Sequence, residues 1–555
     1  MLFKEIISEK ISAIINDLFS IDVSAHIEQS KLEKVGDFST NIAMILAGKL
    51  KTKPLDIANK IIERLENADF LENVNVTNPG FINFHVSKKF LNETLCKFYN
   101  NFEQLIKINI GENKKYNIEF VSANPTGPLN VVNARAASTG AALANLLKRI
   151  GYDVTKEFYI NDAGNQIEIF ANSVRLRYLE LFGEKIDFPP DHYQGEYVIE
   201  IAKEIKKRRA DKYINLSETE QRAAFKDLAK NIVLEWQKSS LKDYGVEFDV
   251  WYSEYDNLHQ TGKVMQTLEY LKNNNLTIEE DGAICLNSKK SGDDKNRALL
   301  KSNGIPTYFL ADLAYHRDKF ERGFEYILDL WGPDHHGHIK RTEIGLKMMN
   351  LNVNNFKVMI IQQVNFIDNG EHLKMSKRKG QIITLNELMA DIPNDVSKFF
   401  FLMRNSDSHL DFDIQLAKTE SQENPVYYVQ YANARIKSIF RKLEEEDARL
   451  FQTFKSYKFD NLDKLSADES ERELMKIIVI YTDEIKGAAL NLQPHRITNY
   501  LRKLAAAFHS YYNKISILSE NDEQTKLQRL ALIDCASKVF VDALKILNIS
   551  APEKM

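Results

Sequence analysis

The stretch GPLNVVNARAAS, residues 127–138, decides the fold. The strand-like segment NIEFV (117–121) precedes it, a Gly-Pro pair ends that strand, and a helix of small residues covers 133–150. Gly151 is typical of a helix C-terminus, and the strand-like YDVTKEFYI (152–160) follows it. This βαβ unit predicts a doubly wound α/β sheet. We expect an anionic ligand at the turn, because free N–H groups at a helix start attract negative charge.

The rest of the chain divides around this unit. Residues 1–100 show helical patterns followed by a hairpin at 74–87, which predicts a small α+β module. Residues 165–245 are charged and helical, and indicate an insertion between two halves of the sheet. From about Pro425 to the end the pattern is helical only. The segments interpreted as further strands are 282–286, 306–316, 325–341 and 357–367.

Composition sets limits on function. The 555 residues carry a formal net charge of −4, which argues against a surface that is basic overall, as in many proteins that bind nucleic-acid duplexes. The basic run 205–213 is, on charge alone, a solvated helix face. No apolar run approaches the ~18 residues of a membrane span, and the N-terminus predicts an amphipathic helix rather than a secretory signal. Cys96, Cys285 and Cys535 form no metal or disulfide pattern, which fits a reducing cytoplasm.

A basic segment, HLKMSKRKGQ (372–381), places four cations within six residues. The flanking strand and helix patterns predict an ordered loop. Such a loop suits the negative charge that develops on departing pyrophosphate. The alternative is an exposed basic loop without a ligand.

Two acidic residues predict a cationic substrate. Glu119 and Asp312, with Asn124 and Tyr308 nearby, are expected near the ends of strands in one sheet. A guanidinium forms paired, charge-assisted hydrogen bonds with carboxylates. The alternative is that the two acids are structural charges on opposite faces of the sheet.

Two further groups of residues are candidates. The segment GPDHHGH (332–338) matches no standard metal-ligand spacing, so we expect neutral hydrogen-bonding groups there and no metal site. On the helix 425–443, Tyr427, Tyr431 and Arg435 combine aromatic and cationic groups. Such a combination suits stacking on single-stranded bases, although core aromatic positions explain it equally well.

Together these motifs resemble one family. The segments EFVSANPTGPL (119–129), YINDAGNQ (159–166), KMSKRKG (374–380) and YVQYANARI (428–436) are similar to bacterial-type arginyl-tRNA synthetases. These are class I aminoacyl-tRNA synthetases, and the resemblance runs nearly end to end, to APEKM (551–555). It implies a Rossmann-type catalytic domain that uses ATP with Mg²⁺ and no zinc. It also implies L-arginine and its tRNA as partners, in a cytoplasmic monomer that binds no membrane.

The resemblance also implies a domain plan and site residues. The expected domains are a tRNA-elbow module (1–105), the catalytic domain (112–367), a KMSKS-loop and stem-contact region (368–424) and a helical anticodon-binding domain (425–555). The arginine-binding positions match Glu119, Asn124, Tyr308 and Asp312. The expected catalytic residues are Asn130, Asn133, Lys374 and Lys377. The expected ATP-binding residues are Gly127, Pro128, Leu129, Asn130, Asn133, Asp334, His338, Met375, Ser376 and Lys377. The tRNA-binding positions are Tyr427, Tyr431 and Arg435.

One departure from the family is large. Its HIGH signature, His-x-Gly-His, stands here as Asn130-Val131-Val132-Asn133. An asparagine amide offers two N–H donors where a neutral imidazole offers one, so both residues can still donate to phosphate. At Val132 an isopropyl group takes the space that glycine leaves to the nucleotide.

Three interpretations follow: an active arginine–tRNA ligase, a tRNA- or arginine-binding paralogue impaired in adenylation, and a different nucleotidyl transferase. The intact KMSKRKG segment favours the first over the second. The tRNA-binding modules argue against the third.

Overall fold

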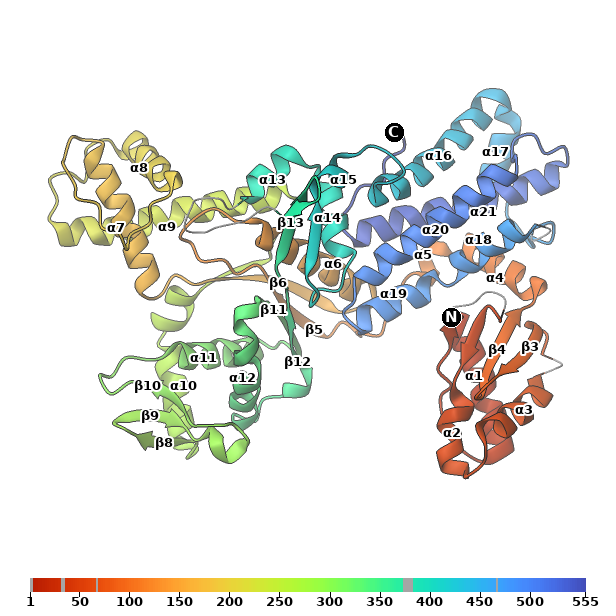
Figure 1. Cartoon of the computed structure of the whole chain (residues 1–555), viewed down its shortest axis with the longest axis horizontal. Helices are drawn as coiled ribbons and strands as arrows, with labels where there is room; N and C mark the ends of the chain where they lie inside the picture. Colours follow the sequence, from red (N-terminus) through yellow and green to blue (C-terminus); the bar gives the residue numbers. More distant parts are fainter. Residues whose placement is uncertain (1–2, 31–34, 66–67, 373–382, 466–467) are drawn as a thin grey trace. The chain divides into compact units, whose positions relative to one another are not determined.

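The computed structural model describes residues 3–30, 35–65, 68–372, 383–465 and 468–555. The chain forms two compact units, coloured along the sequence in Figure 1. Unit 1 comprises residues 1–108, 420–546 and 550–555, and unit 2 comprises residues 109–419 and 547–549. Within the described ranges, none of the helices has both the length and the apolar character that a membrane span requires.

The centre of unit 2 is a parallel sheet of five strands in the order β12–β11–β5–β6–β7. Its strands are β5 (Lys115–Glu119), β6 (Asp153–Ile160), β7 (Val250–Ser253), β11 (Tyr326–Trp331) and β12 (Phe356–Ile360). The chain runs outward from β5 through β6 and β7, then returns to the other side of β5 with β11 and β12. This reversal is the switch point of a doubly wound sheet, where ligands bind beyond the carboxyl ends of the strands. The predicted fold class is therefore confirmed.

Helix α6 (Val131–Arg149) follows β5 and begins two residues earlier than the sequence predicts. Asn130 is its N-cap, and Gly151, just past its end, has a φ of +92°. A Cβ on Gly140 would lie 2.2 Å from the ring of Phe120, so only glycine at this position lets α6 lie so close to Phe120. The small residues predicted from the sequence thus let α6 pack tightly beside β5.

Helix α11 (Tyr308–Glu321) corrects one prediction, because the segment 306–316 is not a strand. The side chain of Thr307 caps the helix by accepting a hydrogen bond from the N–H of Leu310. Leu310, Leu313 and Ala314 are buried at helical spacing. Aromatic residues suggested a strand, but the cap and the three- and four-residue spacing determine a helix.

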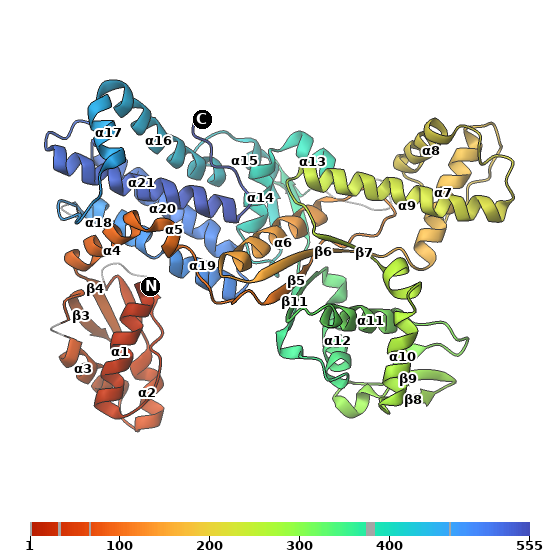
Figure 2. The ribbon, with the colours of Figure 1, turned by 180° about the vertical axis from the view of Figure 1, so that it is seen from behind.

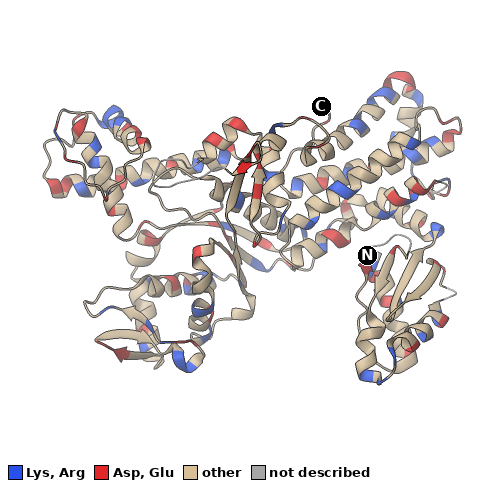
Figure 3. Cartoon of the chain, in the orientation of Figure 1, with Lys and Arg blue, Asp and Glu red and all other residues tan. Residues whose placement is uncertain are grey.

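The predicted insertion is helical, as expected. It consists of α7 (Asn165–Glu180), α8 (Glu196–Arg209) and α9 (Glu218–Asp243), which pack around one apolar core (Figure 2). Both basic and acidic residues lie on this insertion (Figure 3), and the last turn of α8 consists of Lys206, Lys207, Arg208 and Arg209. Arg208 in the basic run pairs with Glu204 and lies 2.9 Å from Glu235. Part of that run is therefore neutralised by neighbouring acids.

Smaller sheets and helices complete unit 2. The segment 282–286 is a strand as predicted, but 325–341 continues into a helix and 357–367 contains two strands of different sheets. An antiparallel sheet contains β8 (Thr277–Glu280), β9 (Ala283–Leu286) and β10 (Arg297–Leu300). A further, mixed sheet contains β13 (Val364–Asp368), β14 (Glu371–His372) and β15 (Leu410–Asp413), in which β13 is antiparallel to β14 and parallel to β15. The remaining helices are α10 (Lys263–Asn273), α12 (His336–Met348), α13 (Leu385–Asp391), α14 (Asn394–Leu402) and α15 (Ile414–Lys418).

Arg135 of α6 joins that helix to the β13–β15 sheet. Its side chain is fully buried and donates to the main-chain oxygens of Gln362, Gln363, Asn405 and Ser408 at 2.8–3.4 Å. Burial lowers the pKa of Arg135 to about 10. The connections that enter β13 and β15 are thereby tied to the helix that follows the signature segment.

Unit 1 contains a sheet and a set of long helices. The N-terminal sheet has the order β1–β2–β4–β3 and includes the predicted hairpin, β3 (Leu71–Thr77) and β4 (Phe81–Val86). The other strands of this sheet are β1 (Glu28–Gln29) and β2 (Phe38–Thr40). The helices that precede unit 2 in the sequence are α1 (Phe3–Phe19), α2 (Ile42–Leu50), α3 (Pro54–Leu65), α4 (Lys88–Asn100) and α5 (Phe102–Leu105). The helices after residue 424 are α16 (Pro425–Glu446), α17 (Ala448–Ser456), α18 (Glu469–Val479), α19 (Tyr481–Leu490), α20 (His495–Lys514) and α21 (Glu523–Ile546).

Candidate active site

The signature segment, Asn130-Val131-Val132-Asn133, forms the first turn of α6 beyond the carboxyl end of β5. The Oδ1 atom of Asn130 accepts from the N–H groups of Val132 and Asn133, at 2.9 and 3.2 Å. In return, Oδ1 of Asn133 accepts from the N–H of Asn130 at 2.9 Å. The two asparagines thus cap the helix reciprocally and direct both side-chain oxygens inward.

This capping corrects the expectation of free main-chain N–H groups for a phosphate. The N–H of Val131 donates to the main-chain oxygen of Ile383 at 3.2 Å, and those of Val132 and Asn133 are used by the cap. In the described part of the chain, no partner occupies the side-chain nitrogens of Asn130 and Asn133. The side-chain amides, rather than the main chain, are the donors that this turn offers.

Residues 383–385, the first ones described after the basic segment, contact this turn. Leu385 donates from its N–H to the main-chain oxygen of Leu129 at 2.8 Å, and Thr384 forms a β-bridge with Asn130. Residues 373–382, with Lys374, Met375, Ser376 and Lys377, lie outside the described residues. The described chain therefore resumes beside the signature at residue 383.

The insertion braces the turn that leads into α6. Gln237 of α9 is buried and donates to the main-chain oxygens of Asn124 and Gly127, at 3.1 and 3.0 Å. A Cβ on Gly127 would lie 3.3 Å from the ring of Tyr197 in α8. These supports were not predicted, because residues far apart in the sequence provide them.

Of the arginine-binding candidates, Asn124 and Tyr308 both lie against the loop 161–166 after β6. Asn124 donates to Gln166 Oε1 at 2.7 Å, and a side chain on Gly164 would stand 3.2 Å from the Tyr308 hydroxyl. Tyr308 is 72% exposed, so its ring is available to a ligand. The sequence expectation that this loop faces the carboxyl edge of the sheet agrees with these contacts.

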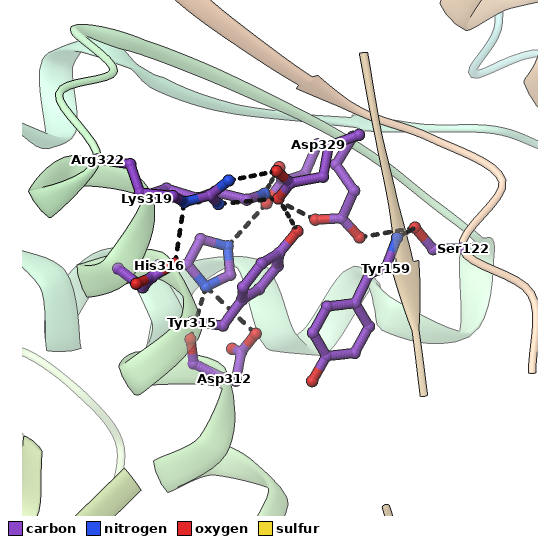
Figure 4. Close-up of polar contacts among 11 residues, drawn as sticks. Ser122, Tyr159, Asp312, Tyr315, His316, Lys319, Arg322 and Asp329 are labelled. Carbon is purple, nitrogen blue, oxygen red and sulfur yellow. Dashed lines mark hydrogen bonds and ion pairs between the residues drawn. The ribbon is translucent and has the colours of Figure 1, made fainter. Parts of the chain in front are cut away.

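The two acidic candidates belong to one polar cluster. In it, His316 links Asp312 to Asp329 (Figure 4), and Lys319 links Asp329 to Glu119. Asp312 lies on α11, and Glu119 ends β5, so the expectation that both acids follow strands is wrong for Asp312. Burial raises the pKa of the Tyr159 hydroxyl well above its usual value, and Glu254, Asp312 and Glu119 add to this rise. The two candidate carboxylates thus both raise the pKa of the Tyr159 hydroxyl.

Their exposure differs. Both oxygens of Glu119 are engaged inside the protein, one with Lys319 at 2.7 Å and the other with Ser122 at 2.9 Å, and its side chain is only 8% exposed. The side chain of Asp312 is 30% exposed and accepts from Thr342 at 3.0 Å. Asp312 is therefore the more accessible of the two carboxylates.

The segment after β11 contains the histidine candidates. Asp334 is exposed in a short 3₁₀ turn, and His338 lies in the first turn of α12. His338 contacts Arg341, with 2.7 Å between its Nε2 and a guanidinium nitrogen. Burial and the charge of Arg341 lower the pKa of His338, so its imidazole stays neutral at pH 7. Across the described ranges, no cluster of three or more histidine, cysteine or acidic residues has the arrangement of a metal site.

In unit 1, the three tRNA-binding candidates lie along one side of α16. The rings of Tyr427 and Tyr431 are nearly parallel, with centroids 6.1 Å apart. The Arg435 guanidinium lies 4.8 Å from the ring centres of both Tyr431 and Tyr512. Tyr512 comes from α20 and was not predicted, because nothing in its local sequence marks it.

Comparison with known proteins assigns most of the chain to one family. Three family models match the chain: "Arginyl tRNA synthetase N terminal domain" at residues 2–86, "tRNA synthetases class I (R), catalytic domain" at 96–413 and "DALR anticodon binding domain" at 429–555. The chain belongs to the arginyl-tRNA synthetase family. The family predicted from the sequence motifs is therefore confirmed.

Individual relatives of this synthetase family extend over almost the whole chain. The "Arginine--tRNA ligase" of Carboxydothermus hydrogenoformans is 41% identical over 96% of this chain and 95% of its own length. That of Geobacter sp. (strain M21) is 40% identical, over 97% and 95%. A structure described as a putative arginyl-tRNA synthetase from Campylobacter jejuni has 31% identity and a TM-score of 0.75, covering 85% of this chain and 100% of that chain. The Thermus thermophilus arginyl-tRNA synthetase, 20% identical, shares the fold over both entire chains with a TM-score of 0.76.

Proposed function

We propose that this chain is an arginine–tRNA ligase, which attaches L-arginine to its cognate tRNA through an arginyl-adenylate made from ATP. The main supporting observation is that candidate residues gather where β5 and β6 end, at the switch point of the sheet. Asn124 contacts Gln166 and Tyr308 lies against Gly164, both in the loop after β6, and Asn130 caps the helix that follows β5. Arginine and ATP therefore meet at the same edge.

Arginine is bound through its guanidinium by Asp312, Asn124 and Tyr308, with Glu119 behind them. A carboxylate with two acceptor oxygens matches the planar fork of a guanidinium, whereas lysine offers only a compact point charge. The exposed ring of Tyr308 covers the planar cation. The enzyme therefore charges arginine and rejects lysine.

ATP binds along the turn formed by Gly127, Pro128 and Leu129 and at the start of α6, with Mg²⁺ as part of the nucleotide substrate. The side-chain amides of Asn130 and Asn133 donate to the phosphates, and Asp334 and His338 contact the nucleotide from the end of β11. The basic segment, with Lys374, Met375, Ser376 and Lys377, closes over the triphosphate. Its lysines stabilise the charge on departing pyrophosphate.

The reaction has two steps. The carboxylate of arginine attacks the α-phosphate in line, so that arginyl-adenylate forms and pyrophosphate leaves. The terminal adenosine hydroxyl of the tRNA then attacks the arginyl carbonyl, and AMP leaves. Positioning and charge stabilisation provide most of the acceleration, as in other phosphoryl transfers.

The tRNA is bound by parts of the chain on both sides of the catalytic region. Residues 1–105 recognise the tRNA elbow, residues 368–424 contact the stem, and residues 425–555 bind the anticodon. Tyr427, Tyr431 and Arg435 stack on unpaired bases. The protein acts as a cytoplasmic monomer, in keeping with its free, buried cysteines.

A tRNA charging assay with purified tRNA for arginine, ATP and Mg²⁺ tests this function. We expect arginyl-tRNA to form with arginine and not with lysine, and pyrophosphate to be released. No comparison supports the alternative, a binding paralogue impaired in adenylation. Binding of tRNA and arginine without any charging would nevertheless establish that alternative and refute the proposal.

A further inference from the structure

A row of charged side chains on helix α11 lies beneath the arginine-binding candidates. Asp312, His316 and Lys319 follow one another at helical spacing, and His316 and Lys319 point toward Asp329 of β11 (Figure 4). Lys319 also donates to Glu119 of β5. These five residues are the buried charge network. Lys319 and Asp329 are fully buried, and the side chain of His316 is 1% exposed.

The contacts of His316 define its protonation. Its Nδ1 lies 2.7 Å from the main-chain oxygen of Asp312 and 3.3 Å from the Oδ1 of the same residue. Its Nε2 lies 2.7 Å from Oδ2 of Asp329. A carbonyl or carboxylate oxygen can only accept, so each ring nitrogen must carry a hydrogen. The ring is therefore an imidazolium.

The surrounding charges stabilise this state. Burial alone would lower the pKa of His316, but Asp312 and Asp329 raise it to about 10. Burial alone would raise the pKa of Asp312, but the charge of His316 and hydrogen bonds from His316 and Thr342 outweigh it, and the net shift is downward. The imidazolium and the accessible carboxylate thus each keep the other charged.

The elements packed around the His316 ring contribute both charged and uncharged groups. Lys319 of its own helix donates to Asp329 at 2.7 Å, and Glu119 of β5 faces the same ammonium. Burial raises the pKa of Glu119, although Lys319 opposes that rise. Strand β12 contributes the uncharged ring of Phe356, at 5.1 Å between centroids.

We propose that His316 is a positioning residue for arginine recognition, because its imidazolium holds the Asp312 carboxylate in place from the buried side. The inference rests on the proposed function and extends it by one residue, which does not itself touch the substrate. Thr342 donates to the second oxygen of Asp312, so the carboxylate is held by an ion pair with His316 on its own helix and by a hydrogen bond from a second helix. Its exposed edge then stays ionised and oriented for a guanidinium.

The first test uses the unaltered protein. If His316 is an imidazolium with a pKa of about 10, its charge is fully present below that pKa and is lost only as the pH rises through it. We therefore expect the KM for arginine in tRNA charging to change less than twofold between pH 6 and 8.5. A rise of tenfold or more between pH 6 and 7.5, as an ordinary imidazole loses its proton, would overturn the inference.

The second test replaces the residue. His316→Gln removes the charge and can donate to only one of the two carboxylates, so we expect the KM for arginine to rise at least tenfold while the KM for ATP stays within twofold. Arg317→Gln removes one positive charge from the adjacent position, where Arg317 pairs with Glu321 outside the network, and should leave both KM values unchanged.

An unchanged KM for arginine in His316→Gln, or an equal rise in both KM values, would show that His316 has no specific role. If the variant does not fold, the pH measurement on the unaltered protein still decides. Absence of charging by the unaltered protein would instead refute the proposed function.

Discussion

Replacing Asn130 by aspartate separates its two roles, the helix cap and the phosphate donor. In the structure, Oδ1 of Asn130 caps α6 through the N–H groups of Val132 and Asn133, while its side-chain nitrogen has no partner among the described residues. A carboxylate keeps the acceptor and lacks the donor. Asn130→Asp therefore preserves the cap and removes the proposed contact to ATP.

The expected magnitudes follow from these two roles. Loss of one positioned donor to a developing charge costs about 10²–10³ in rate, or roughly 2.7–4 kcal/mol. Loss of a cap costs about 1 kcal/mol of stability. A carboxylate at the helix N-terminus is itself favourable by about 0.3–1 kcal/mol. Asn130→Asp should thus lose at least a hundredfold in adenylation rate without a lower melting temperature, whereas Asn130→Ala should lose both.

The assay combines a rapid-quench measurement of adenylate formation, with tRNA bound, and a thermal melt of each variant. Ser217→Ala is the matched control, because Ser217 caps α9 in the same reciprocal way, with Glu220, away from the signature segment. It should lower stability and leave the rate unchanged. Asn130→Asp with a rate within fivefold of the unaltered protein would refute the donor role of this amide.

Three further predictions follow. Arg135→Met leaves buried carbonyl groups without their hydrogen-bond donor, which costs about 1–3 kcal/mol each, so the melting temperature should fall clearly. An unchanged melting temperature would contradict the role of Arg135 in joining α6 to the β13–β15 sheet. Burial alone would raise the pKa of Asp37, but Lys476 at 2.9 Å outweighs this effect and the pKa is lowered, so the stabilisation by this pair is present above the usual aspartate pKa and is lost as the pH falls below about 4. Asp37→Asn should therefore have a lower melting temperature at pH 7 and a melting temperature that depends less on acid pH than that of the unaltered protein. Equal pH dependences of the two proteins would refute the pairing. In charging kinetics, Tyr431→Ala should raise the KM for tRNA by roughly 5- to 150-fold, because one stacked base contributes about 1–3 kcal/mol, and should leave the KM for arginine unchanged. An unchanged KM for tRNA would exclude base stacking by this ring.

The sequence predicted the βαβ unit because its determinants are local. A strand ending at a Gly-Pro pair, small residues and Gly151 suffice to define α6 and the turn before it. The all-helical end from Pro425 and the hairpin near residue 80 followed from equally local patterns. The family motifs then gave the arginine-binding candidates their roles.

The buried charge network was not predicted, because one segment was assigned the wrong secondary structure. With 306–316 interpreted as a strand, Asp312 and His316 fall on the same strand face without a reason to interact. On a helix that starts after Thr307, they lie one turn apart, and Lys319 continues the row. The cap residue, followed by Leu310, Leu313 and Ala314, was the signal that could have found it.

Contacts between segments that are far apart in the sequence could not be predicted from the sequence. The N–H of Val131 donates to Ile383, and the N–H groups of Val132 and Asn133 donate to the side chain of Asn130. The first turn of α6, which the sequence predicted to be open to phosphate, therefore offers no free main-chain donor. Gln237 braces the same turn from more than one hundred residues away. Such partners depend on tertiary structure and leave no local pattern.

The central claim is that a pair of asparagines replaces the histidines of the signature in a working ligase. The most direct measurement compares the rate of adenylate formation, with tRNA bound and saturating arginine and ATP, between the unaltered protein and the variant Asn130→His, Val132→Gly, Asn133→His. We predict rates within tenfold of each other, since the asparagine amides already donate to the phosphates. A gain of several orders of magnitude in the variant would contradict the claim.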